Sequence, residues 1–347
     1  MSGVKLIEVE QDDDGQRIDR WLTKKLPGVP FSLIQKVMRK GQVRVDGGRV
    51  KTDTRLKVGQ IVRVPPVQHR EAGERKLSST DANYMRSLVI YDDGDIIAIN
   101  KPSGLATQGG TNVTRHVDGM LEALNNQDGV KPRLVHRLDK DTSGVLLLAR
   151  SANIARDLGK VFKGRDIQKI YWALVSPAPL MNNGEIRAPI HKAGSSQNEK
   201  MVVDVEEGLA ATTLFDVMDR AHKQAAFVAF WPRTGRTHQI RVHAEHLGCP
   251  IIGDRKYNRR EIEHEHEEIT LDDQKLHKRL HLHAREITFK HPKSKKITTI
   301  TADLPKDLND SWQALGFDPS TKTKPFQDID FRFGKKEIKK TKAKKKK

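Results

Sequence analysis

The sequence predicts an α+β protein of two domains. Its 347 residues correspond to about two domains of average size. A polar stretch without periodicity, residues 67–82, separates a helix-then-strand module at 16–66 from a longer segment, 83–305, in which strand-like and helix-like patterns alternate. We expect residues 1–15 to be an N-terminal extension. Residues 306–347 lose apolar periodicity, so we expect a basic, largely disordered tail there.

The module at 16–66 is predicted to begin with two helices. Pro27–Gly28 ends the first helix and a glycine ends the second. The apolar residues at helical spacing are Ile18, Trp21, Leu22 and Leu26, then Leu33, Ile34, Val37 and Met38. A strand at Gln42–Val45, a turn at Asp46–Gly48 and an alternating strand at Ile61–Val64 complete the module.

The other faces of these two helices are basic. The cationic residues on them include Arg17, Arg20, Lys36, Arg39 and Lys40. The order of helices and strands resembles the S4 domain, a small RNA-binding fold, and this resemblance implies that these five residues contact RNA. The alternative is a helical pair with a solvated basic face.

The net charge indicates a polyanionic partner. Of the formal +18 at pH 7, Lys335–Lys347 contribute +8 through nine lysines and one glutamate, which leaves +10 for the rest of the chain. Nucleic acid is therefore expected ahead of a membrane, with a solubilising surface as the alternative.

The single cysteine, Cys249, excludes an intramolecular disulfide and a multi-cysteine metal site. No secretion signal and no membrane-spanning apolar run is found, so we expect a cytoplasmic protein.

The segment Leu134–Arg150, LVHRLDKDTSGVLLLAR, carries the main chemical signal. A short strand at Leu134–Val135 leads into a polar loop, 136–144, and the apolar run Val145–Ala149 is typical of a strand buried on both faces. Asp139 lies in this loop. Buried strands that hold a charged loop can fix a reactive group in place, whereas the plain alternative is a charged hairpin.

The letters of this loop resemble the HRLD-x-x-TSG signature of the RluA/RluC/RluD family of RNA pseudouridine synthases. Four further segments resemble motifs of the same family. They are Asn100–Gly104 (NKPSG), Lys169–Ala173 (KIYWA), Thr234–His243 (TGRTHQIRVH), and Leu282–Ala284 followed by Phe289 and His291–Pro292. The resemblance covers about residues 84–304. It implies a catalytic domain built on a mixed, mainly antiparallel β-sheet flanked by helices and loops.

The resemblance also implies roles for single residues. In the family the aspartate of the signature is catalytic, which assigns that role to Asp139. The arginine at the turn before a helix pairs with it, a role that we carry to Arg236, with Arg241 as the alternative. Tyr171 is expected to lie against the target base and to assist removal of the C5 proton, and Arg137 to help extrude the nucleotide. The plain alternatives are a structural or phosphate-binding Arg236, a core Tyr171 and a salt-bridging Arg137.

Two smaller expectations concern the same motifs. Thr237 is expected to cap the helix that carries Ile240 on its apolar face. Asn100 and Lys101 have either a structural or a functional role, and the sequence does not choose between them.

A run rich in glutamate and histidine, within residues 261–283, suggests a metal site at first sight. Its members occupy consecutive positions rather than one face, so a solvated insertion fits better and we expect no metal.

Pseudouridylation breaks the C1′–N1 bond of uridine, turns the base and forms C1′–C5. Because the reaction is redox-neutral and the chain has no P-loop or dinucleotide motif, we expect no cofactor. Asp139 could act as a nucleophile at C1′ or as a base at C2′, on a flipped-out uridine.

The substrate expectation rests on the subgroup. Gly109–Gly110 and Asn100–Gly104 resemble the C-type members, which implies large-subunit ribosomal RNA. No protein partner is implied, and we expect a monomer. One rival is a non-catalytic RNA-binding or ribosome-assembly factor on the same fold, which need not keep Asp139, Tyr171 and Arg236. The other is a metal-dependent hydrolase that uses the glutamate- and histidine-rich run, whose activity a chelator would abolish.

Overall fold

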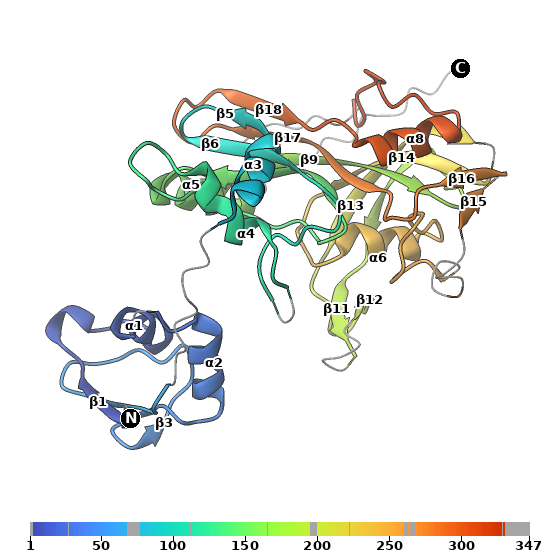
Figure 1. Cartoon of the computed structure of the whole chain (residues 1–347). Helices are drawn as coiled ribbons and strands as arrows, with labels where there is room; N and C mark the ends of the chain where they lie inside the picture. Colours follow the sequence, from blue (N-terminus) through green and yellow to red (C-terminus); the bar gives the residue numbers. More distant parts are fainter. Residues whose placement is uncertain are drawn as a thin grey trace. The chain divides into compact units, whose positions relative to one another are not determined.

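The computed structural model describes residues 3–67 except Pro27, and residues 77–327 and 329 with gaps at 111–112, 165, 195–199, 222, 260–262, 264–267 and 272. The chain divides into two compact units, Met1–Lys76 and Leu77–Lys347 (Figure 1). Within the described residues, no helix combines the length and apolar character needed to cross a membrane.

The first unit packs two helices against a small sheet. Its elements are β1 (Lys5–Glu8), the 3₁₀ turn η1 (Gln11–Asp13), α1 (Ile18–Lys25), α2 (Phe31–Arg39), β2 (Arg44–Val45), β3 (Gly48–Arg49) and β4 (Ile61–Val64). The predicted apolar stripes form the core, in which Trp21, Ile34 and Met38 are buried. Asp46 and Gly47 both have positive φ, as a tight turn between β2 and β3 requires. The predicted pair of helices and the strand at Ile61–Val64 are confirmed.

The N-terminal residues are part of this unit, so the expectation of an extension at 1–15 is wrong. β1 pairs antiparallel with β4 and forms one edge of the sheet, whose order is β1-β4-β2-β3. Asp13 is fully buried and accepts the ammonium groups of Lys24 and Lys25 at 3.0 and 3.1 Å. β1 has only four residues, too few to show a clear alternation of apolar and polar positions in the sequence.

The second unit holds a large sheet with helices on both faces. Its elements are α3 (Ser79–Ser87), β5 (Val89–Asp92), β6 (Ile96–Lys101), α4 (Val117–Met120), η2 (Leu121–Leu124), β7 (Arg133–Leu134), β8 (Ser143–Ala149), α5 (Ala152–Gly164), β9 (Ile167–Val175), β10 (Asn183–Arg187), β11 (Ile190–Ala193), β12 (Lys200–Val203), β13 (Thr212–Ala221), β14 (Ala225–Pro232), α6 (Gln239–His246), β15 (Ile269–Leu271), β16 (Gln274–Leu276), β17 (Leu282–Lys290), β18 (Ile297–Thr301) and α8 (Lys306–Ala314). Because α3 starts at Ser79, the polar linker is shorter than 67–82; residues 68–76 lie outside the described part.

The sheet order is β10-β13-β14-β9-β17-β8-β6-β5, with β18 on β17 and β7 on β8. Only β17 and β8 run parallel among these described pairs, so the predicted mixed, mainly antiparallel sheet is confirmed. Residues of β14 alternate between two cores. Phe227 and Trp231 face the core beside α8, whereas Val228 and Phe230 face the core beside α6. The sheet therefore separates two apolar layers (Figure 1).

Residues 306–326 belong to the second unit, which corrects the expected tail. Helix α8 buries Leu308 and Trp312 in the core, and Phe317 and Phe326 lie in the same cluster. Figure 1 shows α8 beside β14 and β16. The expected boundary at residue 305 coincides with Pro305, which stands at the N-terminus of α8, because proline is favoured at a helix start. Residues 330–347, which include the whole lysine-rich run Lys335–Lys347, lie outside the described part.

Candidate active site

Asp139 lies on the loop between β7 and β8, and side chains from outside the loop bind its backbone on both sides of Asp139. Thr107 Oγ1 donates to the Leu138 carbonyl at 2.7 Å and accepts the Leu138 N–H at 3.2 Å. The Lys101 ammonium donates to the Lys140 carbonyl at 3.0 Å. Ser103 Oγ donates to the Asp141 carbonyl at 2.8 Å. The backbone carbonyls of Leu138, Lys140 and Asp141 are thus fixed on both sides of Asp139. The carboxylate of Asp139 itself lines a cavity.

The buried Lys101 has a structural role. Its ammonium donates to the carbonyls of Pro102, Leu105 and Lys140 at 2.8, 2.8 and 3.0 Å. Burial lowers the pKa of Lys101 to about 7, and three carbonyl acceptors match the three donors of the charged form. The Asn100 side chain donates to the Asp303 carbonyl. The sequence left open whether Asn100 and Lys101 have a structural or a functional role. Their bonds to backbone carbonyls indicate a structural role.

The TSG part of the signature joins β8 to β17. Ser143 Oγ accepts from Arg279 at 2.8 Å and lies 2.9 Å from Nδ1 of the buried His283, whose Nε2 faces the Ala302 carbonyl. Gly144 has φ +114°, and a Cβ there would lie 2.2 Å from the Ala284 carbonyl oxygen. Only glycine fits where the two parallel strands meet. These motif letters position the loop that carries Asp139.

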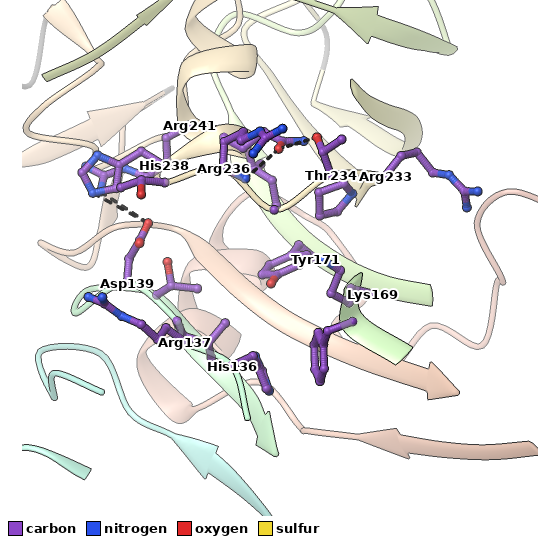
Figure 2. Close-up of a pocket in the computed structure, with 18 of the residues that line it drawn as sticks. His136, Arg137, Asp139, Lys169, Tyr171, Arg233, Thr234, Arg236, His238 and Arg241 are labelled. Atoms are coloured by element: carbon purple, nitrogen blue, oxygen red, sulfur yellow. Dashed lines mark hydrogen bonds and ion pairs between the residues drawn. The ribbon is translucent and has the colours of Figure 1, made fainter. Parts of the chain in front are cut away.

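The cations nearest to the Asp139 carboxylate come from the segment around α6. His238 Nε2 and Arg241 Nη1 each lie 3.9 Å from Asp139 Oδ2. Arg236 lines the same cavity, but its Nε donates to the Ala210 carbonyl at 3.2 Å. The structure thus brings the alternative, Arg241, next to Asp139, whereas the expected counter-ion, Arg236, bonds to a backbone carbonyl. Arg241 lies inside the first turns of α6, which points it across the cavity (Figure 2).

Arg241 is held rigidly from behind. Its Nε and Nη2 donate to the two carboxylate oxygens of Asp254, both at 2.7 Å, and both side chains are almost fully buried. Asp254 also accepts the backbone N–H groups of Lys256 and Tyr257. A bidentate arginine–carboxylate pair fixes the plane of the guanidinium, so the remaining Nη1 faces Asp139 in a set orientation.

His238 is fixed by an unusual backbone and by a tyrosine. It precedes α6 in the left-handed region, with φ +54°, and makes no capping bond; Thr237, the expected cap, is exposed. Strain of this kind gathers at functional sites. Tyr257 Oη accepts the Met201 N–H at 3.1 Å and lies 2.8 Å from His238 Nδ1. If the hydroxyl donates to Nδ1, the imidazole carries its proton on Nε2, toward Asp139. Burial lowers the pKa of His238, although the Asp139 charge opposes this.

Strand β9 forms the opposite side of the cavity. Tyr171 and Lys169 are two residues apart and both line it (Figure 2). Burial, with a smaller effect of Asp139, raises the pKa of Tyr171, so its phenol stays protonated. His136 stacks on Phe162 with ring centroids 4.6 Å apart and accepts the Leu147 N–H at Nε2. Burial lowers the pKa of His136 to about 3, which keeps it neutral.

The cavity has a volume of about 730 Å³, within the range of small-molecule sites. It brings together Asp139, Tyr171, Arg236 and Arg137, which the sequence had assigned, and Arg137 is exposed at its edge. A carboxylate, a flat aromatic ring and several cations around one space can hold a planar base and act on the sugar attached to it.

The five predicted RNA contacts lie in the first unit and have different surroundings. Arg20, Lys36, Arg39 and Lys40 are exposed. Arg17 precedes α1 and donates to both oxygens of Asp19, at 3.2 and 2.8 Å, so its charge is already matched within the unit.

The suspected metal run gives no cluster in the described part of the chain. Residues 261 and 264–267 lie outside it. Of the histidines downstream, His277 lies 3.5 Å from Asp310, whereas His281 and His283 are buried and bond to backbone carbonyls. Two other groups could hold a cation by geometry, Asp93 with Asp95 and His291, and His191 with Asp204 and Glu207, and neither lines the cavity.

Sequence reasoning missed several residues of the site. His238 and Lys169 lie within the motifs TGRTHQIRVH and KIYWA, which marked their segments without giving either residue a role. Asp254 and Tyr257 lie outside these motifs, so neither motif pointed to them. Spacing could not show which motif side chains turn toward Asp139, because that depends on the strained turn before α6.

Known proteins match this chain along most of its length. Family models described as RNA pseudouridylate synthase and S4 domain match residues 95–246 and 16–62. The chain is 38% identical over 317 residues to a Haemophilus influenzae protein named ribosomal large subunit pseudouridine synthase C. The aligned region covers 90% of this chain and 96% of that protein. A Yersinia pestis protein of the same name is 39% identical over 314 residues, with 90% and 96% covered.

A solved structure agrees with the fold of the catalytic unit. Human RNA pseudouridylate synthase domain containing 4 aligns with a TM-score of 0.55 and 26% identity, over 68% of this chain and 97% of that chain. The match to the curated relatives, which extends through the S4 module and the cavity motifs, identifies this chain as a member of the RNA pseudouridylate synthase family.

Proposed function

We propose that this protein isomerises specific uridines to pseudouridine in large-subunit ribosomal RNA, with Asp139 as the catalytic carboxylate. The observation that carries the proposal is the meeting of Asp139, Arg241 and Tyr171 around one cavity, from three motifs far apart in the sequence. The names of the relatives support the choice of ribosomal RNA as substrate.

The first chemical step belongs to Asp139. Its carboxylate either attacks C1′, forming a C–O bond as C1′–N1 breaks, or removes the C2′ proton to give a glycal. In both routes the carboxylate must be ionised and oriented. Arg241 serves this need, because its Nη1 faces Asp139 while Asp254 fixes its other nitrogens. The detached base then turns and C5 bonds to C1′. In the first route the C1′–O bond to Asp139 breaks in this step, and in the second Asp139 returns its proton to C2′. C5 then loses its proton to solvent and N1 takes one up.

Tyr171 supports the base rather than the proton transfer. Its ring borders the cavity, where it can lie against the flipped-out uracil. Because burial raises its pKa, the phenol is a poor proton acceptor at neutral pH. The expected assistance with the C5 proton therefore has no support from its electrostatics. We assign to Arg137 the filling of the space that the nucleotide leaves, because it is exposed and lines the cavity.

The S4 unit supplies affinity for the RNA backbone. The exposed cations Arg20, Lys36, Arg39 and Lys40 can neutralise phosphates, and such binding weakens with salt. Arg17 contributes less in this proposal because Asp19 already binds it. We take the enzyme to act as a monomer in the cytoplasm, without a protein partner. Sedimentation of the purified protein tests the first point, and imaging of a tagged chain the second.

Mapping of pseudouridine in cells tests the proposed function. RNA from cells that lack the protein is compared with RNA from cells complemented with wild type, Asp139→Ala or Asp141→Ala. Asp141 is a matched control because it lies two residues away on the same loop, with an exposed side chain. We expect at least one uridine of the large-subunit RNA to be modified with wild type and Asp141→Ala only. No change at any uridine, or restoration by Asp139→Ala, contradicts the proposal and favours a non-catalytic RNA-binding factor.

A further inference from the structure

Lys169 lies beside the residue that faces the base. It is two residues before Tyr171 on β9, and alternate residues of a strand point to the same face, about 6–7 Å apart. Both side chains line the cavity that contains Asp139 (Figure 2). A uracil that lies against the Tyr171 ring therefore has one edge within reach of the Lys169 ammonium.

The Lys169 ammonium has no hydrogen-bond or ion-pair partner within the described residues. Arg241 and Arg236 in the same cavity are engaged, by Asp254 and by the Ala210 carbonyl. The carboxylate on the neighbouring strand, Glu286, lines a small cavity behind Lys169 and accepts from Thr288. Burial, together with the positive charge of Arg233, lowers the pKa of Lys169 to about 8. A partly buried cation without a counter-charge is costly to keep, which indicates that a negative charge arrives with the substrate.

The proposed reaction creates such a charge at this place. When C1′–N1 breaks, the bonding pair stays with N1, so the detached uracil is an anion whose charge is shared with O2 and O4. This holds whether Asp139 attacks C1′ or removes the C2′ proton. Arg241 cannot fully neutralise it, because Arg241 already faces two carboxylates. A second cation on the base side of the cavity can stabilise this charge, and Lys169 lies beside Tyr171 there.

We propose that the Lys169 ammonium donates a hydrogen bond to the detached uracil and stabilises its negative charge until C5 bonds to C1′. The lysine transfers no proton in this step, and its ammonium stays charged. The electron pair that stayed with the base when C1′–N1 broke is used by C5 to form the C1′–C5 bond. This inference rests on the proposed function and adds a catalytic residue to it. A phosphate of the flipped nucleotide is the other source of negative charge that Lys169 could meet.

Single-turnover rates of Lys169→Met and Lys169→Arg test the role. The substrate is total RNA from cells that lack the protein, grown with or without 5-fluorouracil. Pseudouridine is followed at the mapped target sites. At fluorinated sites C5 carries fluorine and has no proton to lose, so the readout there is breakage of the C1′–N1 bond. We expect Lys169→Met to lower the rate about 10- to 100-fold, in the range of a lost charge-stabilising donor, with an unchanged Kd. Lys169→Arg should recover most of the rate because it keeps the cation. Lys160→Met is the control, since Lys160 is exposed on α5 and pairs with Asp157.

The fluorinated base separates the two sources of charge. Fluorine withdraws electrons and makes the detached base a better leaving group, so the defect of Lys169→Met should shrink on 5-fluorouridine. A phosphate contact would instead give an equal defect on both substrates, a weaker Kd and a salt slope smaller by about one. That pattern, or a wild-type rate in Lys169→Met, overturns the inference alone. An inactive wild type overturns the proposed function as well, so the two failures are distinguishable.

Discussion

The two sides of the cavity treat charge in opposite ways. On the first side, which we call the carboxylate wall, Asp139, His238, Arg241 and Asp254 form a connected set in which each charge faces an opposite charge or a fixed hydrogen bond. On the second side, the β9 wall, the ring of Tyr171 and the ammonium of Lys169 face the cavity, and Lys169 has no counter-charge within the described residues.

The difference separates charges that exist before the reaction from a charge that appears during it. The carboxylate wall needs its ions in place when the RNA arrives, and paired groups meet that need because no reorganisation follows. In the proposed reaction the β9 wall faces the base, which is neutral when it binds and negative once its bond to the sugar is broken. An unpaired cation is suited to a charge of this kind, since it interacts more strongly with the reacting state than with the bound substrate.

The largest effect is expected from Arg241→Gln, which breaks the carboxylate wall. The change leaves buried Asp254 unpaired, so the free energy of unfolding should fall by about 3–5 kcal/mol. The single-turnover rate should fall at least ~100-fold, as for loss of one charge-stabilising group. Arg236→Gln is the matched control and should affect the rate less, because Arg236 bonds to a carbonyl.

A second variant separates stability from chemistry at the same pair. Arg241→Gln combined with Asp254→Asn removes both buried charges and should restore much of the stability in thermal or denaturant unfolding. The rate should stay low, since Asp139 still lacks its counter-ion. Recovery of the rate would show that Arg241 acts only as scaffold.

Tyr257→Phe should weaken the carboxylate wall more mildly. The hydroxyl accepts the Met201 N–H and contacts His238 Nδ1, so its removal should cost about 1–2 kcal/mol of stability. Without the hydroxyl, no partner fixes the proton position on the His238 imidazole beside Asp139. We therefore expect the single-turnover rate to fall about 10-fold. Binding of RNA, measured by titration, should not change. An unaltered rate would mean that the proton position on His238 does not matter.

The pH profile sharpens the comparison, because the β9 wall titrates near neutrality. The pKa of Lys169 lies at about 8 instead of 10.5, so its ammonium is present below pH 8 and is lost above it. The groups that face it are Arg233, Tyr171, His136 and Glu286, and Tyr171 and His136 stay neutral in this range. We expect kcat/KM of wild type to fall several-fold between pH 7.5 and 9, and that of Lys169→Arg to stay level. The same decline in both proteins would assign the titration to another group.

The smallest effect on the chemical step is expected from the S4 unit, which lies outside both walls. Replacement of Lys36, Arg39 and Lys40 by alanine should weaken RNA binding and lower the salt slope by about three at most. The single-turnover rate at saturating RNA should not change. Arg17→Ala is the control, because Asp19 already engages that charge. A lower rate at saturation would mean that the S4 unit also orients the target uridine.

Sequence patterns predicted the parts of the fold that repeat along the chain. The stripes of α1 and α2, the buried strand β8 and the mixed sheet follow from apolar spacing and from motif resemblance. The ends of the units were wrong because β1 and α8 are short, and their stability comes from tertiary pairing and burial rather than local pattern.

The site shows the same division between motif and geometry. Asp139, Tyr171 and Arg137 were assigned from motif letters and do line the cavity. The structure brings Arg241 rather than Arg236 next to Asp139, since the left-handed turn at His238 decides which arginine faces Asp139. Lys169 could not be recognised, because a lysine in a strand reveals its missing partner only when the surrounding side chains are known.

The most direct test of the central claim is a single-turnover assay of Asp139→Asn on RNA from cells that lack the protein. The substitution keeps the shape of the side chain and removes its ability to act as nucleophile or base, and Asp141→Asn on the same loop is the control. We predict that Asp139→Asn binds the RNA with unchanged affinity and forms no pseudouridine, while Asp141→Asn keeps the wild-type rate. Pseudouridine formed by Asp139→Asn at a rate near that of wild type would contradict the account.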